Sequence, residues 1–141
     1  MWICDTHSDT LFAMGVEKNA SPAITPARLR QGGVTLQTFA LWSGRQGNKG
    51  DVKGIMDAEM SMVPTMLAAG MKQVDDPTEA KEGESSFMLS IEGAEIFEGG
   101  LHTVAEWREK GVRMVALLWN NENKLGQSAK SGSAQGLTDY G

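Results

Sequence analysis

A histidine and two aspartates lie close together near the N-terminus, in Asp5-Thr6-His7-Ser8-Asp9, directly after a short apolar run. In an extended chain, residues two apart share a face, so the side chains of His7 and Asp9 point the same way. An imidazole nitrogen beside a carboxylate oxygen is a typical ligand pair for a first-row metal, zinc in particular. The alternative is a helix cap, in which Ser8 or Asp9 accepts a hydrogen bond from a backbone N–H group. The residue types predict one of these two roles.

A second carboxylate, Glu92, follows the apolar run Leu89-Ser90-Ile91 and precedes Gly93. A carboxylate at the end of a buried strand must be paired, ligated or solvated, because burying it alone is costly. An arginine partner or a solvent-facing position would satisfy it as well as a metal. In parallel α/β folds, however, the C-terminal ends of strands form the rim where active sites lie. Glu92 is therefore a candidate partner of the N-terminal histidine and aspartate.

The elements that must position these side chains are short apolar runs alternating with helical patterns. Runs with the length and composition of strands occupy residues 2–4, 34–42, 87–91 and 112–119. Helical spacing or capping signals predict helices at residues 25–30, 51–74, 76–83 and 101–110. In the longest of these helices, Pro64 and Gly70 should kink or weaken the helix. Residues 120–141 have no apolar rhythm and predict a long loop.

This alternation predicts an α/β fold in which parallel strands alternate with helices. Four such units are half of a (β/α)8 TIM-type barrel, but an open doubly wound sheet fits the same pattern. In half of a barrel, the strands near residues 2–6 and 112–118 would lack neighbours. Unpaired apolar edges of this kind promote association.

Composition excludes several classes of function. The 141 residues carry a formal net charge of −5 and no run of Lys or Arg, so no nucleic-acid-binding surface is expected. The single cysteine, Cys4, makes an intramolecular disulfide impossible and a cysteine-based zinc site implausible, and we expect it to be buried in the first strand. No apolar stretch is long enough for a membrane segment, and the first residues lack the features of a signal peptide. These features lead us to expect a cytoplasmic location.

Four motifs recur in a fixed order along the chain. They are Asp-Thr-His-Ser-Asp-Thr-Leu at residues 5–11, Ser-Ile-Glu-Gly at 90–93, Gly-Val-Arg-Met-Val-Ala-Leu-Leu-Trp-Asn at 111–120 and Gly-Leu-Thr-Asp-Tyr-Gly at 136–141. Their order and spacing resemble those of the membrane dipeptidase (renal dipeptidase) family of zinc metallopeptidases. The resemblance covers essentially the whole chain, and four ordered matches are far more specific than any one of them.

The resemblance implies a (β/α)8 barrel that hydrolyses the peptide bond of dipeptides with water activated by two zinc ions. His7 and Asp9 would bind the first zinc, and Glu92 would bridge both as the carboxylate of the catalytic centre. The second zinc of the family takes two further histidines, which this chain lacks, because its other histidine, His102, matches no family ligand. We expect His102 to be a surface or capping residue. Residues 1–141 would then form the N-terminal half of the barrel domain, truncated before the second-zinc ligands.

Trp119 marks a departure from the renal-type members, which have a histidine at the matching position. The stretch Trp119-Asn120-Asn121-Glu122-Asn123 resembles the Trp-Asn-x-x-Asn version of bacterial-type members. Trp119 can form a pocket wall for substrate and donate one N–H group, but it cannot become a cation. The alternative is that it only packs the end of the barrel.

These considerations predict a zinc-dependent dipeptidase with a dipeptide as substrate. A second hypothesis is a truncated or catalytically silent fragment that acts only as a folding or assembly partner. A third is another amidohydrolase-type barrel hydrolase. For the isolated chain we expect at most one weakly bound metal and negligible peptidase activity. Its open edges predict a homo-oligomer or a complementing C-terminal half.

Overall fold

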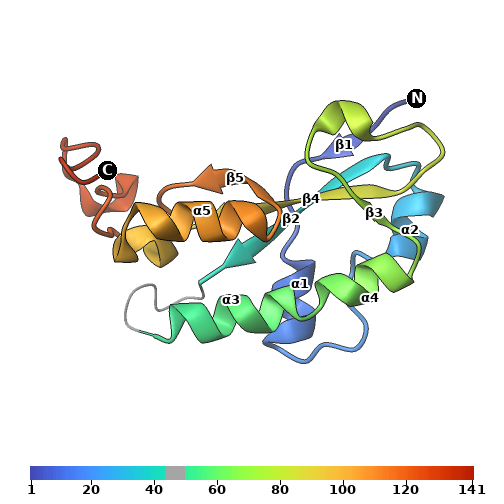
Figure 1. Ribbon diagram of the computed structural model, residues 1–141, viewed down its shortest axis with the longest axis horizontal. Coiled ribbons are helices and arrows are strands. Elements are labelled where there is room, and N and C mark those ends of the chain that lie inside the picture. The colour runs from blue at the N-terminus through green and yellow to red at the C-terminus, as the bar shows by residue number, and fades with distance from the viewer. Residues whose placement is uncertain (44–49) are drawn as a thin grey trace.

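A parallel sheet forms the centre of the fold in the computed structural model, which describes residues 1–43 and 50–141 (Figure 1). Within these residues the strands are β1 Cys4–Asp5, β2 Leu36–Trp42, β3 Lys72–Gln73, β4 Ser86–Glu92 and β5 Val112–Ala116. The sheet runs β1-β2-β4, and both β3 and β5 pair with the far side of β4. All of these pairs are parallel. The predicted α/β alternation is confirmed.

The two long strands, β2 and β4, are the core of the sheet. Each has six buried residues followed by a half-buried one, Trp42 in β2 and Glu92 in β4. These two residues are register partners, so their side chains emerge on the same face of the sheet. On the opposite face, the rings of Phe39 and Phe87 lie with their centroids 5.6 Å apart within the main hydrophobic core. Both strands lie where the apolar runs predicted them.

The helices occupy α1 Thr10–Gly15, α2 Pro26–Gln31, α3 Val52–Met60, α4 Val63–Ala68 and α5 Leu101–Glu109, with 3-10 turns at Pro77–Glu79, Ala94–Gly99 and Ala129–Ser131. The predicted helices at 25–30 and 101–110 are confirmed. In the first of them, the Thr25 side chain accepts a hydrogen bond from the Arg28 N–H group, and Pro26 occupies the first turn.

The predicted helix at 51–74 is wrong in length, whereas the kink or weakening predicted at Pro64 and Gly70 falls where the helix breaks and where it ends. The helix splits into α3 and α4 at Ser61 and Met62, because Pro64 has no N–H group to donate and fits only the first turn of a new helix. The second piece stops before Gly70, which adopts a φ of +86°. The chain then enters β3, a strand that periodicity did not predict.

Three smaller predictions also differ from the structure. The first strand is Cys4–Asp5 rather than residues 2–4, and Cys4 is exposed because β1 pairs on one side only. The acidic helical piece at 76–83 is only a 3-10 turn, Pro77–Glu79, held by a capping box from Asp76. The tail at 120–141 is irregular as predicted, apart from the 3-10 turn Ala129–Ser131 and isolated bridges of Gly126 to Asn123 and Leu137.

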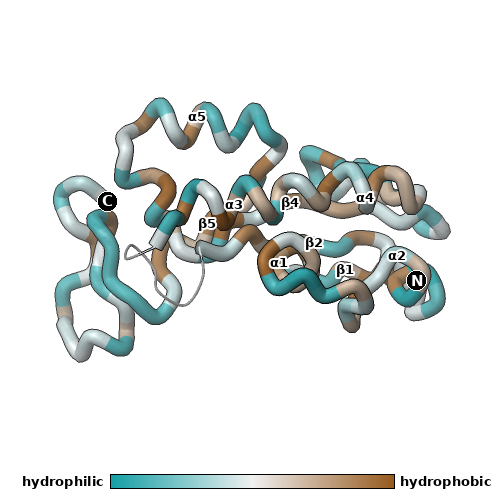
Figure 2. Tube along the Cα trace, turned by 90° about the horizontal axis from the view of Figure 1, so that it is seen from below, coloured by the Kyte–Doolittle hydropathy of each residue, from teal (hydrophilic) through white to brown (hydrophobic). Residues whose placement is uncertain are grey.

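The sheet is open at both edges, as expected for part of a barrel. β1 lies at one edge, and β3 and β5 share the other, where Met114 and Val115 of β5 and the following Leu117 are exposed. The two termini lie at opposite ends of the long axis (Figure 1), and the segment after β5 is mostly hydrophilic (Figure 2). Among the described residues, no helix combines the length and the apolar character needed to cross a membrane.

Helix α1, which begins directly after Asp9, is seated against α3 through a glycine. A Cβ atom at Gly15 would lie 2.4 Å from the carbonyl oxygen of Ala58 on α3. This obstacle is backbone, so a larger residue could be accommodated only by moving one helix away from the other. Gly15 therefore fixes how closely α1, and the aspartate that precedes it, approaches the rest of the fold.

A buried acid connects α3 to the end of β2. The Glu59 side chain is 0% exposed, and both of its carboxylate oxygens lie 3.0 Å from the Trp42 backbone nitrogen, which donates to them. Burial raises the pKa of Glu59 to about 8; the Trp42 N–H group opposes this shift, and the negative charge of Asp9 adds to it. Glu59 is thus a proton-binding group inside the core.

We predict that Gly15→Ala lowers the free energy of unfolding by about 1–3 kcal/mol. Alanine gains up to about 1 kcal/mol of helix propensity over glycine, but the clash with the Ala58 carbonyl outweighs this gain. The matched control is Gly136→Ala, because no atom lies within 4 Å of a Cβ atom at that position. Urea denaturation followed by circular dichroism measures both. A Gly15→Ala variant as stable as the control would contradict this packing.

We also predict that the free energy of unfolding of the metal-free chain falls as pH rises from about 5 to 8. The folded state keeps the Glu59 proton up to about pH 8, whereas the unfolded carboxyl group loses it near its ordinary value of 4.5. This stabilisation is complete below pH 4.5 and is lost through pH 8, by at most about 1.4 kcal/mol per pH unit.

Glu59→Gln should remove this component of the pH dependence, because a neutral amide oxygen can still accept from Trp42. Denaturation in urea at several pH values, with a chelator present, measures the slope. Glu109→Gln, at an exposed position of α5, should leave it unchanged. Equal slopes for wild type and Glu59→Gln would refute the assignment.

Candidate metal centre

His7 lies in the short loop that leaves β1 at the C-terminal end of the sheet. Its backbone N–H group donates to Asp5 Oδ1 at 3.0 Å, which turns the chain immediately after the strand. The next residue, Ser8, is tied to β2 by a 2.9 Å hydrogen bond from the Ala40 N–H group to its carbonyl oxygen. The loop that carries His7 is therefore held against the sheet by backbone bonds.

Asp9 stands at the N-cap position of α1, yet its side chain makes no capping hydrogen bond. Ser8 does not cap the helix either, since its Oγ atom pairs with Thr10 Oγ1 at 2.8 Å. The capping alternative is therefore not what the structure shows. Instead, the Asp9 carboxylate faces the imidazole, with Oδ1 3.2 Å from His7 Nε2.

Glu92 is the last residue of β4, and its Oε2 atom lies 3.6 Å from the same His7 Nε2 atom. The chain turns directly afterwards at Gly93, where φ is +84° and a Cβ atom would lie 2.6 Å from Glu95 Oε2. The turn is anchored to the neighbouring strand, because the Gly93 N–H group donates to the Ala116 carbonyl oxygen at 3.0 Å. Glu92 is thus held at the rim by its strand and by the turn that follows.

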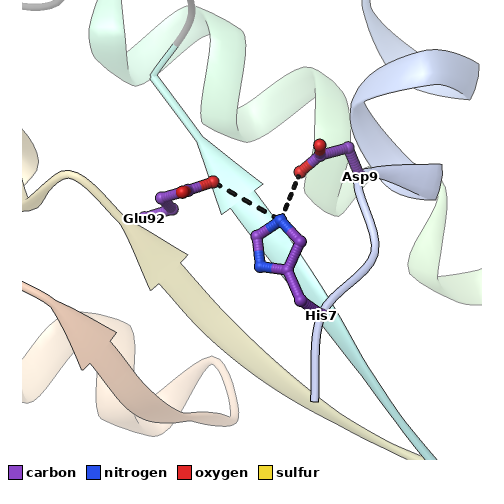
Figure 3. A group of neighbouring side chains, drawn as sticks. All are labelled: His7, Asp9 and Glu92. Atoms are coloured by element: carbon purple, nitrogen blue, oxygen red, sulfur yellow. Dashed lines mark ion pairs between the residues drawn. The ribbon is translucent and has the colours of Figure 1, made fainter. Parts of the chain in front are cut away.

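The side chains of His7, Asp9 and Glu92 converge on one point (Figure 3). One nitrogen and two carboxylate oxygens, one atom from each residue, lie within 4.8 Å of one another. His7 and Asp9 are about half exposed, and Glu92 is 24% exposed. Burial raises the pKa of Glu92; His7 opposes this shift, and the charge of Asp9 adds to it. Two carboxylates facing one imidazole suit a divalent cation, and nitrogen and oxygen donors suit zinc.

Trp119 lies just beyond β5 and contacts Trp42 at the end of β2. Their ring centroids are 4.9 Å apart with an interplanar angle of 67°. Phe12 of α1 also contacts Trp42, with 4.9 Å between the two ring centroids. The three rings line a pocket that also includes Asp9. The sequence analysis did not identify Phe12 or Trp42 as site residues, although Trp42 is the last residue of the second predicted strand.

His102 is exposed at the start of α5, as expected for a surface histidine. It is not part of the group formed by the other histidine and the two carboxylates. Within residues 1–43 and 50–141, this group is the one set of potential ligands with metal-binding geometry.

Several solved structures share this fold. A crystal structure of dipeptidase AC, a metallopeptidase of family M19, gives a TM-score of 0.73 at 17% identity, covering 90% of this chain and 45% of its own. A metallopeptidase from Rhodobacter sphaeroides, liganded with a phosphinate mimic of the dipeptide L-Ala-D-Ala, gives 0.72 at 16% identity, with coverages of 90% and 48%. An amidohydrolase from Pseudomonas aeruginosa gives 0.64 at 14% identity, with coverages of 99% and 38%.

The chain thus spans about half the length of the first two of these proteins or less. Its sheet and helices correspond to about half of a (β/α)8 barrel, so the alternative of an open doubly wound sheet is set aside. No curated protein sequence matches the chain significantly. A model of the membrane dipeptidase family, peptidase family M19, matches residues 1–141 in full. The chain therefore belongs to the membrane dipeptidase family of metallopeptidases.

Proposed function

We propose that the chain serves a zinc-dependent dipeptidase, in which His7, Asp9 and Glu92 hold metal. The observation that carries this proposal is the convergence of one imidazole nitrogen and two carboxylate oxygens at the C-terminal rim of a parallel sheet. Family membership supports hydrolysis of a dipeptide as the reaction. The rim is also where enzymes of this architecture place their catalytic groups.

In this proposal, His7 and Asp9 would hold the first zinc, and Glu92 would be a ligand of both zinc ions. When bound, zinc would lower the pKa of a water molecule and polarise the scissile carbonyl group. The chain's own residues orient this centre. The loop after β1 is hydrogen-bonded to β2, and the turn after β4 is hydrogen-bonded to β5. The backbone of both segments is therefore fixed before a ligand binds. Further ligands of the second zinc are proposed to come from outside residues 1–141.

The approach of substrate is set by the exposure of the three residues. Glu92 is the most buried and closes the strand side of the centre, whereas His7 and Asp9 are open to solvent. A dipeptide would therefore approach from the side of α1. On this side Trp119, with Trp42, is proposed to form a wall against the substrate. Simple packing at the end of the barrel is the competing role for Trp119.

A second candidate function is that of a catalytically silent assembly partner. Two observations favour it. The described residues supply one metal-binding group, and β5 ends the sheet as an open strand with exposed apolar side chains. An amidohydrolase acting on a different amide would use the same metal centre, and one structural neighbour is described as an amidohydrolase.

The proposed ligands are tested by zinc titration. We expect the chain to bind one zinc equivalent, and His7→Ala and Glu92→Gln each to weaken binding by at least about tenfold, since each removes or neutralises a ligand. Isothermal titration calorimetry and metal content by mass spectrometry measure the effect. His102→Ala is the matched control and should bind zinc as wild type does. Binding that survives both ligand substitutions would sink the assignment.

Activity separates the dipeptidase from the silent partner. We expect negligible dipeptide hydrolysis by the 141-residue chain alone, because the described residues offer only Glu92 to the second metal. We expect zinc-dependent hydrolysis from a polypeptide that contains this chain together with the remaining barrel strands. Rapid turnover by the 141-residue chain would contradict the first expectation. A metal-free, inactive longer polypeptide would contradict the second and favour the assembly role.

The open edge at β5 is proposed to receive either a second copy of the chain or a complementing half of the barrel. We predict concentration-dependent association of the isolated chain in sedimentation velocity. Val115→Lys should weaken it, because a charge on an edge strand discourages strand addition. Leu67→Lys, which changes an exposed apolar residue on α4, is the control. A monomer at all concentrations would argue against this role of the edge.

A further inference from the structure

A pocket of about 570 Å³ adjoins the metal centre and shares Asp9 with it. Its lining residues are Asp9, Phe12, Ala13, Glu17, Trp42 and Trp119. The volume lies within the range of small-molecule sites, about 300–1,000 Å³. Because the two sites have a residue in common, a molecule held by the metal centre could extend a side chain into this pocket.

The walls of the pocket are aromatic. Phe12 and Trp42 lie 4.9 Å apart between centroids at 55°, and Trp42 and Trp119 lie 4.9 Å apart at 67°. The three rings come from α1, from the end of β2 and from the segment after β5, and each is half-buried. Tilted rings in mutual contact brace one another while part of each stays accessible.

The backbone of Trp42 is also fixed by a hydrogen bond to α3. Its backbone N–H group donates to both carboxylate oxygens of the buried Glu59, at 3.0 Å each. Trp42 is in register with Glu92, so the same strand pair positions the aromatic wall and the metal centre. The pocket is therefore organised before any ligand is present, which reduces the ordering cost of binding.

The charge of the pocket is negative. Its lining contains the carboxylates of Asp9 and Glu17, and no Lys or Arg of the described residues lines it. The neighbouring Lys18 donates its ammonium group to the Gly15 carbonyl oxygen at the end of α1. Within the described part of the chain, Glu17 forms no ion pair. With Asp9 engaged at the metal centre, Glu17 is the carboxylate left to meet a ligand.

We propose that this pocket binds a cationic side chain with an apolar stem, as in lysine or arginine. Aromatic faces attract an ammonium or guanidinium group through cation–π interactions, and Glu17 adds an opposite charge. The methylene stem packs on the rings, as such stems do on apolar surfaces. Insofar as the occupant is a side chain of a dipeptide, the inference rests on the proposed function and narrows its substrate to dipeptides with a basic residue.

The pocket can be tested without metal or peptide. The metal-free, 15N-labelled chain is titrated with n-butylammonium and, separately, with n-butanol, and the indole N–H signals are followed by NMR. We expect saturable shifts of Trp42 and Trp119 with n-butylammonium only. Trp107, buried in the core, and Trp2, next to β1, serve as internal references. Equal responses to the amine and the alcohol would overturn the proposal.

Two variants identify the carboxylate involved. Glu17→Gln should weaken n-butylammonium binding by about three- to tenfold, since it removes a charge from a partly exposed site. Glu109→Gln, an exposed acid at the end of α5, should have no effect. Both substitutions are on the surface, so folding is preserved, which the unshifted signals of the two reference tryptophans verify. Unchanged binding by Glu17→Gln would show that the Glu17 carboxylate does not attract the cation, and would overturn the proposal.

A second titration connects the pocket to the metal centre. The zinc-loaded chain is titrated with lysyl-alanine and with norleucyl-alanine, which share the four-carbon stem and differ in the ammonium group. We expect about tenfold tighter binding of the lysyl peptide, a difference that one desolvated cation–π contact supplies. Equal affinities would overturn the pocket and leave the dipeptidase proposal standing. Amine binding at Trp42 and Trp119 with no zinc uptake would support the pocket and count against the metal centre.

Discussion

The arrangement of this molecule depends on two carboxylates meeting one imidazole nitrogen. Asp9 and Glu92 both lie within 3.6 Å of His7 Nε2, and neither is satisfied by a helix cap or an arginine. Bringing two negative charges together is unfavourable unless a cation joins them. The strand order β1-β2-β4 makes the meeting possible, because it places the ends of the first and third of these strands across one intervening strand. The sheet, the hydrogen-bonded loop after β1 and the turn at Gly93 together hold these three side chains in contact.

Much of the fold could be predicted from local patterns, because β2 and β4 are long, buried and bounded by turn signals. The helix predicted at 51–74 is shorter and divided because the apolar spacing continues past Pro64, which cannot donate a helical hydrogen bond, and past Gly70, whose φ of +86° ends α4. The burial of Cys4 was wrong for a different reason. Its exposure follows from the edge position of β1, which depends on what lies beyond the sheet and is not encoded in the residue itself.

The convergence of His7, Asp9 and Glu92 was predictable in part, because each follows an apolar run and the ends of parallel strands share one rim. The groups around it were not. The sequence gives no sign that Glu59 is buried, because its partner, the Trp42 N–H group of β2, is placed beside it only by the tertiary fold. Phe12, Trp42 and Trp119 come from three distant segments, and their contact is a property of the tertiary fold alone. Sequence spacing identifies residues on one element, whereas a pocket is assembled from several.

The short pairing of β1 has a consequence for folding. This strand contacts β2 through two register pairs, Cys4 with Leu36 and Asp5 with Gln37, so a short ladder, flanked by backbone bonds at Ile3 and Ser8, attaches the N-terminal segment to the sheet. A cation shared by Asp9 and Glu92 would clip the chain's beginning to the end of β4, closing a very long loop in a single contact. Occupancy of the centre and attachment of the first strand would then be thermodynamically linked, and metal supply would govern how much of the chain exists with its N-terminus docked.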